Sequence, residues 1–526
     1  MKSILLTSKE SLECKSDMVR RLNPSRKRHR KLGFEVWSWK PGSVSDEPIE
    51  VNPCRSSILT GKQAERIKRL RQNGIFKPAD KSRCLHYMSR ETFHKMTLKL
   101  LNNGNYEEVD VNRTTMAIQQ VREIISKHRG KDYQLGGKLK RAKLEGTRER
   151  WLYPLPKDHK EPHPDGIMKA RPIVDCKLTP LASIDKICAD WFKPLYSKMT
   201  DIVKTDSIAV LQNLRSLNEK NIEANFIVQL DVEDLYGNTP IEESIDSVIK
   251  FAIDNNMGDS GALLTLKELL TVILNNNVFR FADRRYIQRH GIPMGSNMSP
   301  LLADVFLYLK EKAIFKPDEW PGLTQLNRYR DDILAICEDE ATAKRLVEAY
   351  NTMHPRIKVT GEISETNAIF LDLKIGKLPV GKLRLGVYHK PMDTLAPLHW
   401  QSQHPRPCLL ATIYARAIRT TRICNNATDW WSTFINFLHP SMHQGYRFET
   451  ILKQWTKAIE FCVKTEWPHV KNKHEKALKA KEYRTTNVLT YSNELRPIYR
   501  LLKKRCRFAL RVGKPMQARL CRTNDH

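Results

Sequence analysis

The stretch NFIVQLDVEDLY, residues 225–236, decides the fold prediction. Its first six residues form a short, mainly apolar run of strand length, and the run ends at Asp231. Thr239, Pro240 and Glu242 then show the pattern of an N-cap, a first helical position and a capping box. Apolar residues follow at helical spacing, namely Ile241, Ile245, Val248, Ile249 and Ala252. The sequence predicts a strand, a turn and a helix with one face on a core.

Later stretches continue this mixed pattern. Ser299 and Pro300 predict an N-cap and first position for a core helix from Leu301 to about Phe315. Residues 333–337 (ILAIC) read as a strand that leaves a tight turn at residues 330–332, and residues 449–463 show helical period. We therefore expect an α+β chain with a helical C-terminal region.

The composition indicates a folded protein that binds a polyanion. The chain has 526 residues, 40% of them hydrophobic, with 89 Lys and Arg against 59 Asp and Glu, a net charge of +30. Such a chain has enough apolar residues for a folded core, and its excess of cations favours a polyanionic partner, most often nucleic acid. A basic ribosome-associated or membrane-surface protein is the alternative. The eleven cysteines have no regular spacing, which favours reduced thiols in an intracellular compartment, and no apolar run approaches membrane-spanning length.

The positive charge is concentrated in three stretches. Residues 20–31 hold a basic run without an acid. Residues 138–150 form a second basic stretch, and residues 471–526 carry 16 Lys and Arg against four acids. The first run has the composition of a nuclear localisation signal or of an RNA-binding arm. We expect a nuclear protein, with the cytoplasm as the alternative.

Two acidic features stand out against this background. Asp231 ends the first strand, and Asp331 and Asp332 occupy the turn of an expected hairpin. Either feature alone is usually a cap or a turn. Together they match the need of two-metal phosphoryl transfer for carboxylates from separate strands that converge on ions about 4 Å apart. Like charges held that close repel unless divalent cations bind between them.

The residues around these acids resemble a known family. The segments DVEDLY at 231–236, GIPMGSNMSP at 291–300 and YRDD at 329–332 resemble motifs A, B and C of reverse transcriptases. LPKDHK at 155–160 and ARPIV at 170–174 resemble the fingers segment of the same enzymes. FLDL at 370–373, YHKPMDT at 388–394, SQHP at 402–405 and KPADK at 77–81 are similar to blocks of Penelope-like retroelements. The resemblance covers residues 75 to 425, approximately.

The resemblance implies a right-hand polymerase with fingers, palm and thumb and an antiparallel palm sheet. Asp231 and Asp331 would bind two Mg²⁺ ions, for which Mn²⁺ is a possible substitute. The backbone carbonyl of Val232 would complete one metal site, and Asp332 would be the supporting third carboxylate.

It also implies a nucleotide site. Arg171, and with it Lys157, would bind the incoming triphosphate, although Lys160 and Lys169 are alternatives to Lys157.

Tyr236 would stack under the sugar and exclude a 2′-hydroxyl, which favours DNA synthesis over RNA synthesis. Met294 and Gly295 would form the pocket floor, where glycine lets the backbone approach the templating pair.

Some positions depart from the family pattern. Arg330 stands where the family usually has a small or apolar residue near the primer end, so it would bind primer phosphate or alter fidelity. Lys358 is a candidate general acid only by its place after the catalytic hairpin, and His399 and His404 are expected to be structural. We find no trace of the GIY-YIG nuclease that most Penelope-like proteins carry.

The expected domains are a basic N-terminal extension at 1–75, a region preceding the fingers at 76–150, fingers and palm at 151–375, a mainly helical connection and thumb at 376–470, and a basic tail at 471–526. The tryptophans near the C-terminus, Trp430, Trp431, Trp455 and Trp467, are expected in the core of the thumb. The function implied is an RNA-directed DNA polymerase that uses an RNA template, a DNA primer and dNTPs, with no membrane and an open oligomeric state. A nucleic-acid-binding protein that has lost catalysis and an RNA-dependent RNA polymerase are the alternatives.

Overall fold

The computed structural model describes residues 61–81, 85–110, 113–128, 130–144, 148–177, 179–222, 224–378, 381–391, 393–402, 404–465, 487–490 and 508–511. Tertiary contacts divide the chain into two units, one of Phe76–Asp393 with Lys514–His526 and one of Met1–Ile75 with Thr394–Gly513. The predictions for the basic run at 20–31, for Trp467 and for most of the tail at 471–526 lie outside the described residues.

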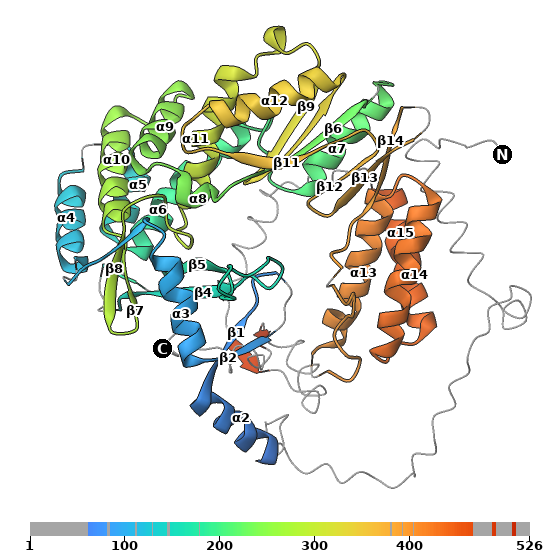
Figure 1. Ribbon diagram of the computed structural model, residues 1–526, viewed down its shortest axis with the longest axis horizontal. Coiled ribbons are helices and arrows are strands. Elements are labelled where there is room, and N and C mark those ends of the chain that lie inside the picture. Colours follow the sequence, from blue (N-terminus) through green and yellow to red (C-terminus); the bar gives the residue numbers. More distant parts are fainter. Residues whose placement is uncertain are drawn as a thin grey trace, which may run out of the picture. The chain divides into compact units, whose positions relative to one another are not determined.

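A four-stranded antiparallel sheet, which we call the palm sheet, holds the acidic motifs. Its order is β11 (Val359–Ser364), β6 (Phe226–Val232), β10 (Asp332–Cys337) and β9 (Leu323–Tyr329) (Figure 1). The central strands β6 and β10 are nearly continuous apolar runs, because their residues pack on the core. The predicted strands and the antiparallel palm sheet are confirmed.

Helices cover the palm sheet with apolar faces. α11 (Ser299–Ile314) is buried along most of its length, as predicted for a core helix. α9 (Ile241–Asp254) packs against it and buries Ile245, Val248 and Ala252. α12 (Glu340–Thr352) connects β10 to β11.

The starts of two helices differ from the predicted caps. The Thr239 hydroxyl donates to the carbonyl of Leu235 at 2.7 Å, closing the short helix α8 (Leu235–Asn238), so it does not cap α9. α9 begins at Ile241 after an extended Pro240, without a capping box. α11 begins at Ser299 itself, whose buried hydroxyl has no partner in the described part of the chain. Both predictions were wrong because the hydroxyl that would cap the helix is bonded or buried elsewhere.

A five-stranded sheet, which we call the fingers sheet, lies in the same unit. Its order is β3 (Tyr106–Glu108), β8 (Arg284–Gln288), β7 (Val278–Phe281), β4 (Arg150–Pro156) and β5 (Ala170–Asp175). The pair β1 (Gly74–Pro78) and β2 (Leu85–Ser89) precedes it, followed by α3 (Arg90–Leu101).

Helical segments link these sheets and complete the larger unit. They are α4 (Thr114–Ser126), α5 (Tyr133–Lys140), α6 (Ala182–Phe192), the 3₁₀ helix Lys193–Lys198, α7 (Ser207–Glu219), α10 (Ser260–Asn275) and the 3₁₀ helix Pro317–Glu319. A three-stranded antiparallel sheet of β12 (Asn367–Phe370), β13 (Leu373–Lys377) and β14 (Leu383–Val387) follows the palm. These strands lie within the segment Phe76–Asp393, so by contacts they belong to the same unit as the palm.

The second unit is mainly helical. It holds α2 (Gly61–Asn73), α13 (Arg406–Ile423), α14 (Ala427–His443) and α15 (Phe448–Lys464), and the last three lie side by side (Figure 1). Trp430 and Trp455 are fully buried among these helices with ring centroids 5.4 Å apart, which confirms their predicted core role. The short strands β15 (Asn487–Thr490) and β16 (Phe508–Arg511) pair in parallel. Within the described residues, we find no helix with the length and apolarity needed to cross a bilayer.

Candidate active site

Strand pairing brings the three predicted aspartates together at one end of the palm sheet. Asp332 on β10 lies directly opposite Asp231 on β6 in the antiparallel register. Asp331 occupies the two-residue turn between β9 and β10, because Tyr329 pairs with Asp332. The Val232 N–H donates to the Asp331 carbonyl at 2.9 Å, which ties the turn to β6. Directly opposed residues of antiparallel strands have their side chains within about 5 Å, so these carboxylates share one site.

Burial, and after it the charges of neighbouring aspartates, raises the pKa of Asp332 and of Asp231. Burial raises the pKa of Asp332 to about 6, and the charges of Asp331 and Asp231 add to the rise. Burial also raises the pKa of Asp231, and Asp331 again adds to it, while Lys160 and Lys81 act in the opposite direction. A cation between the carboxylates would remove this repulsion.

The donor set fits a hard divalent cation, because carboxylate and carbonyl oxygens are the ligands that Mg²⁺ and Mn²⁺ prefer. Among the residues that the structure describes, no three Asp, Glu, His or Cys side chains are already spaced as a closed metal site.

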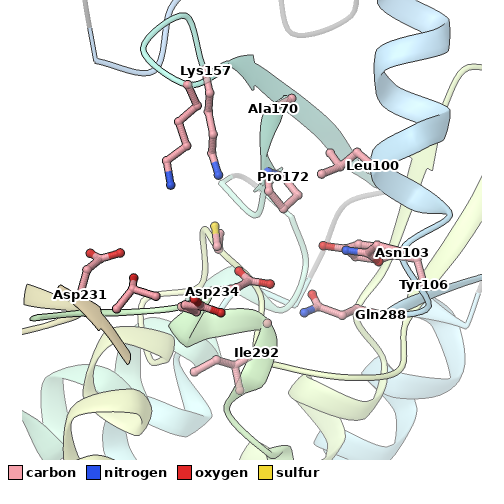
Figure 2. Close-up of a pocket in the computed structure, with 15 residues that line it drawn as sticks. Leu100, Asn103, Tyr106, Lys157, Ala170, Pro172, Asp231, Asp234, Gln288 and Ile292 are labelled. Atoms are coloured by element: carbon pink, nitrogen blue, oxygen red, sulfur yellow. The ribbon is translucent and has the colours of Figure 1, made fainter. Parts of the chain in front are cut away.

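A cavity of about 340 Å³ opens beside the acidic cluster. The acids Asp231, Glu233 and Asp234 line this cavity, and so do Lys157 and Lys160. Figure 2 shows Lys157 extending toward Asp231 and Asp234. A cavity lined by both acids and lysines suits a ligand that carries both phosphates and bound cations.

Lys157 and Arg171, the residues predicted to bind the triphosphate, differ in their position relative to the cavity, because only Lys157 lines it. Burial lowers the pKa of Lys157, and the nearby charges of Arg171 and Lys160 lower it further, so three cations gather beside the cavity. The Nε of Arg171 lies 2.9 Å from Oδ1 of Asp80 in an ion pair, although the N–H direction misses hydrogen-bond geometry. Arg171 lies beside the cavity, whereas its strand neighbours Ala170 and Pro172 line it.

The loop that carries Met294 and Gly295, the predicted pocket floor, is hydrogen-bonded to Tyr236, the predicted sugar gate. The Ile292 N–H donates to the Tyr236 carbonyl at 2.8 Å, and the Val174 N–H donates to the Met294 carbonyl at 2.9 Å. Gly295 has φ of +135°, and the Val174 carbonyl occupies the space that a Cβ there would need. The close approach that requires glycine is thus made to β5 of the fingers sheet.

Sequence reasoning did not single out Asp234 or Asp185 as residues of this site. Asp234 lines the cavity with a left-handed φ of +40°, and burial raises its pKa while Lys157 opposes the rise. Its only sequence signal was its place three residues after Asp231. Asp185 on α6 is 2% exposed and accepts hydrogen bonds from the Ser296 hydroxyl at 2.7 Å and from the Asn297 N–H at 2.6 Å. It anchors the loop that carries Met294 and Gly295, and no local pattern marks it.

The side chains of Arg330, Lys358 and His404 are each bonded to other residues of the described chain. The Arg330 guanidinium turns toward α11, where it pairs with Asp304 and donates to the Pro300 carbonyl at 3.1 Å. The Lys358 ammonium donates to the Asn351 carbonyl at 2.7 Å and does not line the cavity. His404 shares a 2.6 Å hydrogen bond with Ser402 within its own loop.

Comparison with known proteins agrees with this geometry. Residues 157–361 match the family described as reverse transcriptase (RNA-dependent DNA polymerase). The matched segment contains Asp231, Asp331 and Asp332 and spans less than half of the chain. No curated protein matches the sequence.

Two solved structures are similar to this chain at low sequence identity. Telomerase from Candida albicans, in complex with a fragment of telomeric RNA, is 10% identical with a TM-score of 0.51, over 84% of this chain and 75% of that chain. Apo telomerase from Candida tropicalis is 10% identical with a TM-score of 0.46, over 75% of this chain and 66% of that chain. The first likeness, together with the α+β sheets described above, shows the right-hand polymerase fold. The matched segment is similar to reverse transcriptase domains, which are nucleotidyltransferases that generally use divalent metal ions.

Proposed function

We propose that this chain is the RNA-directed DNA polymerase of a Penelope-like retroelement, and that Asp231, Asp331 and Asp332 bind its catalytic Mg²⁺ ions. The observation that carries the proposal is the direct pairing of Asp231 with Asp332 across β6 and β10, with Asp331 at the adjoining turn. Crowded carboxylates that raise one another's pKa destabilise a fold, so a metal-dependent function explains their presence better than a purely structural one.

The roles of the residues follow from their positions. When bound, two divalent cations would activate the primer 3′-hydroxyl and neutralise the triphosphate, and the Val232 carbonyl would supply one further ligand. Lys157 and Lys160, which line the cavity, would bind phosphate oxygens. Arg171 would join them from its place beside the cavity.

Selectivity for the sugar would come from Tyr236. Its half-buried ring lies close enough to Asp331 and Arg330 for their charges to affect its pKa, which burial raises. A ring at this place would contact the sugar of a nucleotide bound between the acids and the lysines and would clash with a 2′-hydroxyl. The substrates would therefore be dNTPs, added to a DNA primer on an RNA template.

The Penelope-like assignment rests on the sequence blocks downstream of the palm. FLDL at 370–373 forms the tight hairpin between β12 and β13, and SQHP at 402–405 precedes α13. The basic run at 20–31 would serve nuclear import or RNA binding.

Primer extension tests the proposal. The purified chain is given a DNA primer on an RNA template with Mg²⁺, and dNTPs or rNTPs are supplied in separate reactions. We expect incorporation of dNTPs and strong discrimination against rNTPs. Incorporation of rNTPs alone would identify an RNA polymerase, and template binding without incorporation would identify a binding protein.

A further inference from the structure

A buried cluster of two arginines and two acids lies directly behind the catalytic turn. Arg328 and Arg330 flank Tyr329 where β9 enters the turn, and Asp304 and Glu311 lie on α11. We call these four residues the Arg–acid cluster. The side chains of Arg328, Asp304 and Glu311 are at most 1% exposed, and that of Arg330 is 30% exposed.

Asp304 joins the two arginines. Its Oδ1 lies 3.0 Å from Nη1 of Arg328, and its Oδ2 pairs with Nη1 of Arg330. Arg328 also donates from Nε to Glu311 at 2.7 Å, so the two positive charges meet two negative ones. A buried charge requires such a partner, because an unpaired one is very costly inside a protein.

The cluster also binds the backbone of the turn. Nη1 of Arg328 donates to the Arg330 carbonyl at 3.2 Å, immediately before Asp331. Nη1 of Arg330 donates to the Tyr196 hydroxyl at 2.7 Å, and that hydroxyl donates to Asp304 at 3.0 Å. Side-chain and main-chain contacts therefore hold the same turn from α11 and from the 3₁₀ helix Lys193–Lys198.

The backbone of the turn gives an independent indication. Arg330 has φ of +61°, in the left-handed region that disfavours residues other than glycine, asparagine and aspartate. It is the first of the two residues between Tyr329 and Asp332, a hairpin position where glycine is common. An arginine here carries a conformational cost, which its side-chain contacts must offset.

We propose that Arg330 is a positioning residue. Its ion pair with Asp304 anchors the turn between β9 and β10, which carries Asp331, to α11. On this account the tether holds Asp331 and Asp332 in the arrangement needed to bind divalent cations together with Asp231. The inference rests on the proposed function of these three aspartates. It replaces the expectation that Arg330 contacts the primer, because the guanidinium is engaged by Asp304, Tyr196 and Pro300.

Two variants of Arg330 separate the tether from the shape of the turn. Arg330→Gly relieves the left-handed backbone but removes the tether, and Arg330→Gln removes the charge but keeps a polar side chain. Arg330 lies over the ring of Tyr196 and donates to the Pro300 carbonyl. Arg345→Gln is the matched control, since Arg345 lies over the ring of Trp320 and donates to the Glu319 carbonyl. Arg345 lies on α12 and contacts no residue of the Arg–acid cluster in the described part of the chain.

The measurements are the single-turnover rate of dNTP addition, the Mg²⁺ concentration at half-maximal rate, and the Mg²⁺-induced rise in melting temperature. We expect both Arg330 variants to lower the rate or raise the Mg²⁺ requirement about 10- to 100-fold, as loss of outer contacts to metal ligands does. The Mg²⁺-induced rise in melting temperature should shrink in both variants, and Arg345→Gln should match the wild type.

An Arg330→Gly variant with wild-type rate, Mg²⁺ requirement and thermal response to Mg²⁺ would overturn the inference. The turn would then hold Asp331 and Asp332 in place without the side chain of Arg330. The thermal response decides the inference even if the wild-type chain adds no dNTP. Absence of incorporation by the wild type would instead overturn the proposed function.

Discussion

Asp332→Asn should stabilise the metal-free protein while it abolishes polymerisation. Burial and the charges of Asp331 and Asp231 raise the pKa of Asp332 from 3.8 to about 6. Ionised Asp332 is therefore less favourable in the folded chain than in the unfolded one. That cost is fully present above the folded pKa of about 6 and disappears as the pH falls through the unfolded value of 3.8.

The size of the effect follows from the same values. The difference between 3.8 and about 6 corresponds to about 3 kcal/mol at most. Asp332 is partly exposed, so screening by solvent reduces the expected gain to about 1–2 kcal/mol. For a unit of this size, the melting temperature should rise by roughly 1.5–3 °C in the presence of a chelator at about pH 7.5.

Thermal unfolding in chelator at about pH 7.5 and at about pH 4.5, with and without added Mg²⁺, measures this effect. The gain should shrink at the lower pH, and Mg²⁺ should stabilise the wild type more than the variant. Asp190→Asn is the control, because Asp190 is an exposed partner of Lys186 on α6 and should leave the melting temperature unchanged. A variant that melts below the wild type in chelator at about pH 7.5, or one whose gain is the same at both pH values, would refute the reasoning.

Three further substitutions test separate parts of the account. Tyr236→Ala should admit rNTPs in primer extension with little change in the use of dNTPs, and unchanged selectivity would remove the sugar-gate role. Asp185→Asn puts an amide donor among the Ser296, Asn297 and Met298 donors and should raise the KM for dNTPs, whereas an unchanged KM would show that the loop holds its shape without it. Asp304→Asn leaves Arg328 and Arg330 short of one buried charge, so denaturant unfolding should show a loss of about 3–5 kcal/mol, and a loss below about 1 kcal/mol would contradict the pairing described.

The strands of the palm sheet could be predicted from the sequence because the patterns that mark them are local. The apolar run before Asp231 and the strand after Asp332 are short-range patterns, and the family motifs then predicted that they meet. The predicted caps at Thr239 and Ser299 were wrong, because the local pattern does not show that the Thr239 hydroxyl bonds to Leu235 or that Ser299 is buried.

The parts of the site that depend on distant contacts were not predictable in this way. Asp80 is 91 positions from Arg171, and Asp185 is 111 positions from Ser296, so no spacing rule connects either pair. Arg330 was recognised as unusual, and Asp304 was visible as the one acid within the apolar run 301–309. Only the three-dimensional structure shows that Arg330 and Asp304 form an ion pair.

Single-turnover dNTP addition on an RNA template by Asp231→Asn tests the central claim most directly. Glu362→Gln is the matched control, an exposed acid on β11 of the same sheet whose strand partner is Gln229. The account predicts a loss of about 1,000-fold or more for Asp231→Asn, since several kcal/mol of transition-state stabilisation depend on the metal site, and wild-type rates for Glu362→Gln. A rate for Asp231→Asn within about tenfold of the wild type would contradict the assignment of the catalytic metal site to these carboxylates.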